Sequence, residues 1–174
     1  MTSIAVEILA LVVYGPLVVV LHELGHALAA RFGGYRVTSF GIGLGKPLWR
    51  IELSGGVVLH VDRWLMAGGA CTAIPIGATT RRRAWFHGGG LLAQVLLGGV
   101  LLALPDVWLV DRLIQFNLLV AITNAVPWRI GASASDGWYL LDLVVDGRRS
   151  GSVLGQRHRF ARIGRREAEV GSPV

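Results

Sequence analysis

Residues 4–30 read IAVEILALVVYGPLVVVLHELGHALAA, an apolar stretch that contains the pattern His22-Glu-Leu-Gly-His26 near its far end. A helix needs roughly 20 apolar residues to cross the hydrocarbon core of a membrane, and this stretch is longer. Glu7 is the only charged residue before His22. Arg31 and the pair Gly33-Gly34 predict where the helix ends. The stretch therefore predicts a membrane-spanning helix with ionisable groups in its last third.

The composition of the whole chain also favours a membrane protein. Hydrophobic residues make up 53% of the 174 residues and charged residues 16%, and the mean hydropathy is +0.56. Soluble domains usually carry about 25% charged residues. The net charge of +6 comes mainly from residues 148–174, which hold seven Arg and two Glu. We expect one membrane domain over residues 1–146 and a mobile, Arg-rich tail over residues 147–174.

Two further stretches are candidate spans. Residues 84–104 are interrupted only by His87 and Gln94. Residues 107–126 form a weaker candidate because they contain the polar side chains of Asp111, Arg112, Gln115, Asn117 and Asn124. About twenty helical residues cover roughly 30 Å, the thickness of the hydrocarbon core, so we expect three spans in all.

The segment between the first two spans has the alternating pattern of β-strands. Residues 48–53 and 57–62 flank the turn sequence Ser54-Gly-Gly56, which predicts a β-hairpin within residues 40–63. Residues 40–45 are expected to add an edge strand. The expected fold is therefore a mainly α membrane protein, with a three-helix core and a membrane-proximal hairpin or small sheet.

The distribution of basic residues predicts the orientation. Residues 31–83 hold eight Lys or Arg, and the chain from Arg129 onward holds eight more. Residues 1–7 and 105–112 together hold one Arg and three acidic residues. Because positively charged loops stay in the cytoplasm, we expect a multi-pass protein of the cell membrane with its N-terminus outside. The hairpin, the C-terminus and the histidine pair then lie at or near the cytoplasmic face.

The histidine pair has the spacing of a metal site. His22 and His26 are four residues apart, so on a helix both imidazoles project from one face and can bind one ion. Glu23 is one position on, where its carboxylate can take a proton from water without binding the metal. Zinc hydrolases use this combination. Charged groups at mid-membrane cost roughly 2.5–3.5 kcal/mol each, which favours a functional role for the three residues.

A zinc site usually takes a third protein ligand, and the spacing alone leaves several candidates open. Asp136 follows the third span on the same side as the histidines, although an aspartate there can also cap a helix. The carboxylate and imidazole candidates are Glu52, His60, His87, Asp111, Asp136, Asp142 and Asp146. Cys71 is the only cysteine, which excludes both an intrachain disulfide and a site of several thiolates.

Several stretches between residues 18 and 140 resemble the site-2 protease family of intramembrane zinc metalloproteases. They are His22-Glu-Leu-Gly-His26, Phe40-Gly-Ile-Gly-Leu-Gly45, Gly88-Gly-Gly-Leu-Leu-Ala-Gln94 and Asn124-Ala-Val-Pro127 ahead of Asp136-Gly137. The resemblance implies an intramembrane protease core with zinc as its cofactor. In the family the aspartate is the third zinc ligand, which implies Asp136. The asparagine helps to hold the substrate backbone, which implies Asn124.

The chain departs from the family pattern at two points. Residues 128–135 separate Pro127 from Asp136, where the family usually has only a few residues. Gln94 stands where the family often has Asn, and no role is assigned to it. Many relatives carry an extra peptide-binding domain or further spans, whereas this chain is expected to hold the catalytic core alone.

We therefore expect a zinc endopeptidase whose substrates are membrane-spanning or membrane-proximal segments of proteins. Because helical backbone resists cleavage, the open edge of the hairpin at residues 48–53 could pair with an unwound substrate. The alternative is a membrane adaptor or scaffold that keeps a metal site without proteolysis. A soluble zinc protease is disfavoured by the apolar spans.

The expected partners follow from charge and composition. The Arg-rich tail predicts contact with anionic lipid head groups. Apart from Phe160 it lacks interleaved aromatic residues, so no nucleic acid is expected. A regulatory partner protein could supply the peptide-binding function.

Overall fold

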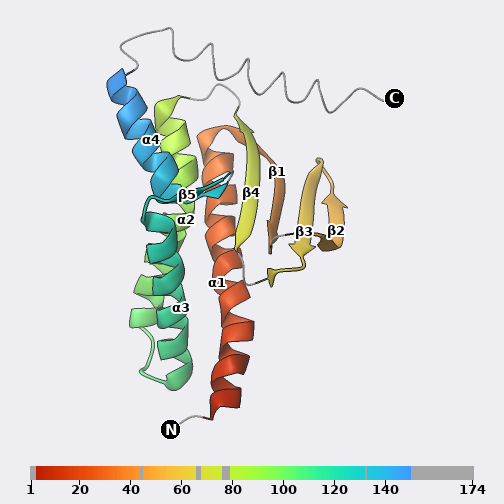
Figure 1. Ribbon diagram of the computed structural model, residues 1–174, viewed down its shortest axis with the longest axis vertical. Coiled ribbons are helices and arrows are strands. Elements are labelled where there is room, and N and C mark those ends of the chain that lie inside the picture. Colours follow the sequence, from red (N-terminus) through yellow and green to blue (C-terminus); the bar gives the residue numbers. More distant parts are fainter. Residues whose placement is uncertain (1–2, 44, 66–67, 76–78, 132, 150–174) are drawn as a thin grey trace.

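The computed structural model describes residues 3–149 except 44, 66–67, 76–78 and 132 (Figure 1). Its helices are α1 (Ile4–Gly33), α2 (Thr80–Leu102), α3 (Trp108–Ala125) and α4 (Asp136–Arg149). Its strands are β1 (Tyr35–Ile42), β2 (Pro47–Leu53), β3 (Val57–Asp62), β4 (Gly69–Pro75), β5 (Arg129–Ile130) and β6 (Ser133–Ala134). The expected tail lies outside the described residues from position 150 onward.

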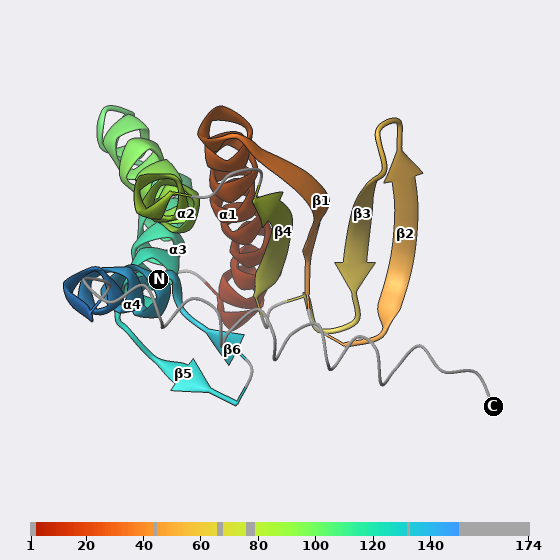
Figure 2. The ribbon, with the colours of Figure 1, turned by 90° about the horizontal axis from the view of Figure 1, so that it is seen from above.

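The long helix α1 lies between the other helices and the sheet (Figures 1 and 2). It begins after Ser3, whose hydroxyl accepts a hydrogen bond from the Val6 N–H. The helix is capped at its C-terminal end by Gly34, whose φ of 74° is in the left-handed region that glycine adopts readily. Within the described residues, α1 and α2 are long and apolar enough to cross a membrane. α3 forms where the third span was expected, but it is not among these candidates, so a third crossing stays a prediction.

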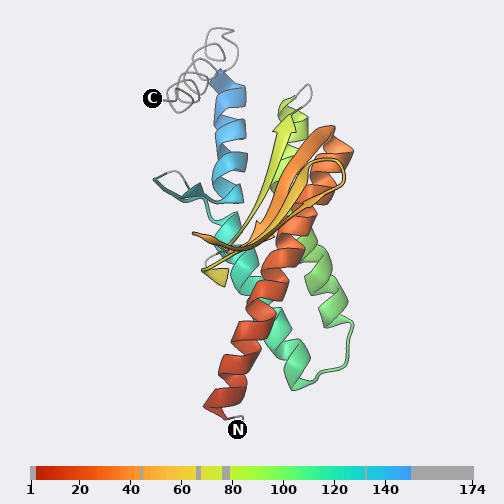
Figure 3. The same cartoon turned by 90° about the vertical axis from the view of Figure 1, so that its right-hand side faces the viewer.

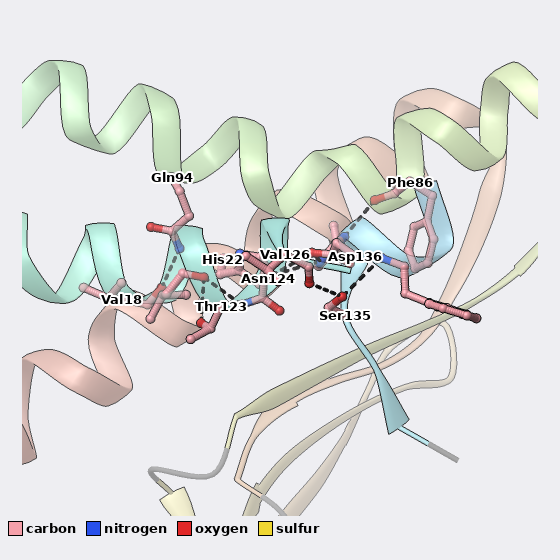
Figure 4. Close-up of polar contacts among 12 residues, drawn as sticks. Val18, His22, Phe86, Gln94, Thr123, Asn124, Val126, Ser135 and Asp136 are labelled. Atoms are coloured by element: carbon pink, nitrogen blue, oxygen red, sulfur yellow. Dashed lines mark hydrogen bonds and ion pairs between the residues drawn. The ribbon is translucent and has the colours of Figure 1, made fainter. Parts of the chain in front are cut away.

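Polar contacts join the three long helices. Glu7 at the start of α1 forms an ion pair with Arg112 of α3, with Oε2 and Nε 3.0 Å apart. The Gln94 amide of α2 donates to the Val18 carbonyl of α1 at 3.3 Å (Figure 4). The Asn117 side-chain amide of α3 donates to the backbone carbonyl of Gln94 at 3.0 Å. Several polar residues that weakened the third predicted span therefore have partners inside the helical bundle.

The sheet has the strand order β2-β3-β1-β4, and β4 is the strand next to α1 (Figure 2). The predicted hairpin is confirmed as β2 and β3. The expected edge strand at residues 40–45 is wrong, because β1 lies inside the sheet between β3 and β4. β1 pairs with β3 in parallel and with β4 in antiparallel orientation. Both pairings join residues distant in sequence, so local alternation did not reveal them.

The chain leaves α3 through a short hairpin before α4 begins. β5 and β6 pair in antiparallel orientation and project sideways, while α4 continues beyond the end of α3 (Figure 3). This arrangement brings the first residue of α4 beside the last third of α1.

Candidate metal centre

Two histidines of α1 and one aspartate of α4 converge on a single point. His22 Nε2 lies 3.0 Å from Asp136 Oδ2, and His26 Nε2 lies 3.1 Å from the same oxygen. The two Nε2 atoms are 3.2 Å apart. All three residues are buried, and Figure 4 shows Asp136 beside His22. Among the described residues, this is the group of His, Cys, Asp and Glu side chains placed to hold a metal ion.

The spacing of these three atoms fits a zinc ion. Zinc binds nitrogen and carboxylate oxygen at about 2.0–2.2 Å in tetrahedral geometry, which separates its ligand atoms by about 3.3–3.5 Å. The observed separations of 3.0–3.2 Å are close to that value. Asp136 Oδ2 is buried and lies within 3.1 Å of both imidazole nitrogens. A cation would satisfy this oxygen together with the two nitrogen atoms.

The hydrogen bond on the far side of His26 fixes the role of its ring. His26 Nδ1 lies 2.7 Å from the backbone carbonyl of Phe86 in α2. A carbonyl only accepts, so Nδ1 carries the proton and Nε2 presents its lone pair to the centre. The Phe86 ring also packs against the imidazole, with centroids 5.5 Å apart. α2 therefore orients a candidate metal ligand that α1 supplies.

Glycines on α2 make room for the centre. A side chain at Gly90 would place its Cβ 2.5 Å from both His22 Cε1 and His26 Nε2. Beside Gly90, the helices α1 and α2 cross with their backbones nearly in contact. A Cβ at Gly25 of α1 would lie 2.4 Å from the carbonyl oxygen of Gly89 in α2. The two imidazoles thus lie between α1 and the glycine face of α2.

Ser135 positions Asp136 at the start of α4. The Ser135 hydroxyl accepts a hydrogen bond from the Trp138 N–H at 3.1 Å, so Ser135 caps the helix. The cap predicted as one role for Asp136 is therefore filled by its neighbour. Burial raises the pKa of the Asp136 carboxyl, but the adjacent His22 and His26 imidazoles outweigh burial and hold this pKa below its ordinary value. Asp136 is thus favoured as the charged carboxylate that a metal ion requires.

Glu23 lies between the candidate metal-binding group and β4. It is 7% exposed, and a Cβ at Gly69 would lie 2.6 Å from its Cγ and 2.8 Å from its Oε1. The backbone of Cys71, also in β4, hydrogen-bonds to the Glu23 carboxylate. The carboxylate is close enough to interact with the charges of His22, His26 and Asp136. It is therefore held beside the centre without being part of it.

The remaining candidates are not part of the converging group. His87 stacks on Tyr139 of α4, with centroids 4.4 Å apart, and His60 pairs with Asp62 within β3. Asn124 is half-buried near the end of α3, and its amide donates to the Val120 carbonyl at 2.9 Å. Its role toward a substrate stays a prediction. The other candidate carboxylates that do not belong to this group are those of Glu52, Asp111, Asp142 and Asp146.

Sequence reasoning missed three contributors to the site: Ser135, Gly90 and the strand β4. A serine directly before an aspartate and an apolar helical segment was a readable helix-start signal for Ser135. Gly90 was visible only as one of a glycine run. β4 had no readable signal beyond weak alternation, because its partner β1 lies far from it in the sequence.

Two buried histidines on an apolar helix, joined by an aspartate from another helix and with a glutamate beside them, form the arrangement of a membrane-associated metalloprotease. The family model described as Peptidase family M50 matches residues 8–115, more than half of the chain. The chain therefore belongs to Peptidase family M50, the site-2 protease family, as its motifs predicted. A comparison with curated proteins found no match. The matched region contains His22, Glu23 and His26 but ends before Asp136, whose placement rests on geometry.

Membership in this family implies a metalloprotease. Together with the two apolar helices, it also indicates a membrane protein.

Proposed function

We propose that the chain is a zinc-dependent endopeptidase that cleaves membrane-spanning or membrane-proximal segments of protein substrates. The observation that carries the proposal is the convergence of His22, His26 and Asp136 within 3.0–3.2 Å, with Glu23 beside them. These three residues would hold the ion, and Glu23 would serve as general base. Family membership supports the protease class, and the donor set supports zinc.

The side chains divide the chemistry between them. A bound zinc ion supplies a Lewis acid that polarises the scissile carbonyl and acidifies water. Glu23 takes the proton of the attacking water and returns it to the leaving amine nitrogen as the peptide bond breaks. Burial of Glu23 keeps this proton transfer away from bulk solvent. Asn124, near the end of α3, is proposed to hold the substrate backbone.

The strand β4 is the better candidate for binding an extended substrate. The edge expected to do so, residues 48–53, belongs to β2 on the margin of the sheet farthest from α1 (Figure 2). Within the described residues, β4 pairs only with β1, and it carries the Gly69 and Cys71 contacts to Glu23. A substrate added to β4 as a further strand would present its backbone next to the general base.

We also propose the orientation that the basic residues favour, with the N-terminus outside and the C-terminus and metal centre toward the cytoplasm. α1 rises about 44 Å from Ile4 to Gly33 at 1.5 Å per residue. That rise exceeds the hydrocarbon core of about 30 Å, so the centre, in the last third of the helix, would lie on the cytoplasmic side of the bilayer midplane. Under this proposal α3 is a third span, and the tail meets anionic lipid head groups.

The decisive experiment separates metal binding from proton transfer. Zinc content of the purified protein is measured by mass spectrometry, and new peptide ends are mapped in membranes of cells that express each variant. Glu23→Gln should keep zinc while cleavage falls by at least the roughly 10²–10⁴-fold typical of a lost general base. The variants His22→Ala and His26→Ala should lose both bound zinc and cleavage activity.

The alternative function, an adaptor or scaffold that retains a metal site, makes the opposite prediction. Zinc would be present in the native protein, but no peptide ends would differ between the native chain and Glu23→Gln. Cleavage that persists in Glu23→Gln would instead refute the role of this residue as general base.

A further inference from the structure

An apolar groove runs along the line where α1 and α2 cross. It holds about 390 Å³, and every lining side chain is apolar. Small residues form its floor, among them Gly25 and Ala29 of α1 and Ala93 of α2. Larger side chains form its walls, namely Leu28, Phe32, Trp85, Leu92 and Leu96. The groove exists because the small residues that let the helices approach leave no side chains to fill the crossing.

A second hollow, which includes the positively charged side chain of Arg81, adjoins the groove. Trp85 and Leu92 also line a second hollow of about 370 Å³, whose other lining residues are Arg81, Ala84 and Gly88. Arg81 lies in the first turn of α2, which contains no acidic residue. The partial positive charge of a helix N-terminus adds to that of the guanidinium. Arg82 lies against Gly34, with Nη1 3.4 Å from the position of a Cβ there, so Arg81 is the arginine that faces the hollow.

The shape and charge together select one class of occupant. The site combines an apolar slot with one guanidinium group at its end, which matches a molecule with a hydrocarbon chain and an anionic head better than it matches an uncharged apolar helix. A single hydrocarbon chain fits such a slot. From Arg81 to Leu96 the helix α2 rises about 22 Å, which is about the thickness of one leaflet including its head groups. Trp85, half-exposed at the junction, is the residue type that favours the level of the head groups.

We propose that this groove binds an anionic phospholipid, with an acyl chain between α1 and α2 and the phosphate at Arg81. The residues that line the site include none of the proposed metal ligands. It depends on the membrane placement of the chain and not on proteolysis. Lipid binding and peptide cleavage can therefore fail separately.

The test measures quenching of Trp85 fluorescence by brominated acyl chains. The full chain is placed in phosphatidylcholine vesicles that contain increasing fractions of brominated phosphatidylglycerol or brominated phosphatidylcholine. The difference from Trp85→Phe isolates the Trp85 signal. We expect half-maximal quenching at an about fivefold lower fraction of the anionic lipid, the preference that one arginine near a membrane surface provides. Glu23→Gln should leave the quenching unchanged.

Matched variants test each part of the site. Arg81→Gln should remove the preference for phosphatidylglycerol, whereas Arg63→Gln, at an exposed arginine after β3, should keep it. Gly88→Leu places a side chain in the hollow, and a Cβ at Gly88 meets nothing within 4 Å, so the helices should pack unchanged. It should reduce quenching by both lipids. Gly99→Leu, equally free of contacts on the same helix, should not.

Three outcomes would overturn the proposal. Equal quenching by the two lipids in the native chain would remove the role of Arg81. Undiminished quenching in Gly88→Leu, with its helix content unchanged by circular dichroism, would place the lipid outside the groove. Absence of Trp85 quenching, together with crosslinking of two chains through this face, would assign the groove to a second copy.

Discussion

Trp128 and Ser135 are joined by two hydrogen bonds across the residues that separate α3 from α4. The Trp128 N–H donates to Ser135 Oγ at 3.1 Å, and the Ser135 N–H donates to the Trp128 carbonyl at 3.1 Å. The Ser135 hydroxyl also donates to the Val126 carbonyl at 2.8 Å. These bonds close the β5–β6 hairpin at its base. The extra residues between Pro127 and Asp136 therefore project outward as this hairpin. Asp136 stays beside the two histidines.

Replacing Ser135 tests whether this closure positions the metal ligand. Ser135→Ala should cost about 0.5–2 kcal/mol of stability, because α4 loses its cap. It should also weaken zinc binding by about 10–100-fold, as loss of a group that orients a ligand does. Zinc affinity is measured by competition with a chelator. Ser135→Thr keeps the hydroxyl and should restore binding, whereas unchanged affinity in Ser135→Ala would show that Asp136 does not depend on the closure.

Gly90 should be intolerant of any side chain. Gly90→Ala would place a methyl group 2.5 Å from both imidazoles, so the protein should lose zinc and activity while its helix content persists. Gly99→Ala on the same helix meets nothing within 4 Å. Because alanine favours a helix more than glycine does, Gly99→Ala should stabilise the protein slightly, by up to about 1 kcal/mol. Zinc content and thermal unfolding would be measured for both, and full zinc in Gly90→Ala would contradict the described centre.

Gly69 of β4 should affect catalysis without affecting the metal. The Cβ of Gly69→Ala would lie 2.6 Å from Glu23 Cγ, so the glutamate side chain must move while His22 and His26 are untouched. Cleavage should fall by about 10-fold or more at unchanged zinc content, because a general base needs hydrogen-bond reach to its proton. Turnover equal to that of the native chain would show that the position of Glu23 beside β4 is unimportant.

Cys71 should react slowly with thiol reagents. Burial raises the pKa of its thiol to about 12, and the nearby Glu23 carboxylate adds to the effect. At pH 8 the thiolate fraction is then on the order of one in ten thousand, compared with about one in four for an ordinary cysteine. Maleimide labelling, followed by mass spectrometry, should therefore accelerate about tenfold per pH unit between pH 7 and 10.

The same assay has an internal control. Glu23→Gln removes a negative charge near the sulfur, so it should lower the pKa of Cys71 and speed labelling at fixed pH. Complete labelling of the native chain within minutes at pH 7 would be inconsistent with the described environment of Cys71.

Reporter fusions test the proposed orientation. Because the basic residues gather after α1 and after α3, a reporter fused after Val174 should be active in the cytoplasm. A reporter inserted near Pro105, between α2 and α3, should be active outside. Enzyme reporters that function on only one side of the membrane provide the measurement. The reverse pattern would invert the placement of the metal centre, and a cytoplasmic Pro105 reporter alone would show that α2 does not cross.

The sequence alone determined those features that depend on local spacing. The separation of His22 and His26 by four residues places both rings on one helical face, and the length and apolarity of residues 4–30 predict the helix itself. The turn at Ser54-Gly-Gly56 predicted the β2–β3 hairpin for the same reason. Hydrophobic periodicity and turn chemistry act over a few residues, so the helices and hairpins that depend on them can be predicted from the sequence.

Local spacing did not decide which residue joins the histidines, nor which strand faces the proposed general base. Spacing left seven candidates open for the third ligand, the family motif pointed to Asp136, and the tertiary structure places Asp136 beside both rings. Asp136 meets His22 because the Trp128–Ser135 closure takes up the intervening residues, and Gly90 lets α2 pack against both rings. β4 lies beside Glu23 because its partner β1 follows α1 directly. These contacts join segments far apart in sequence, and their energy comes from packing that no local pattern encodes.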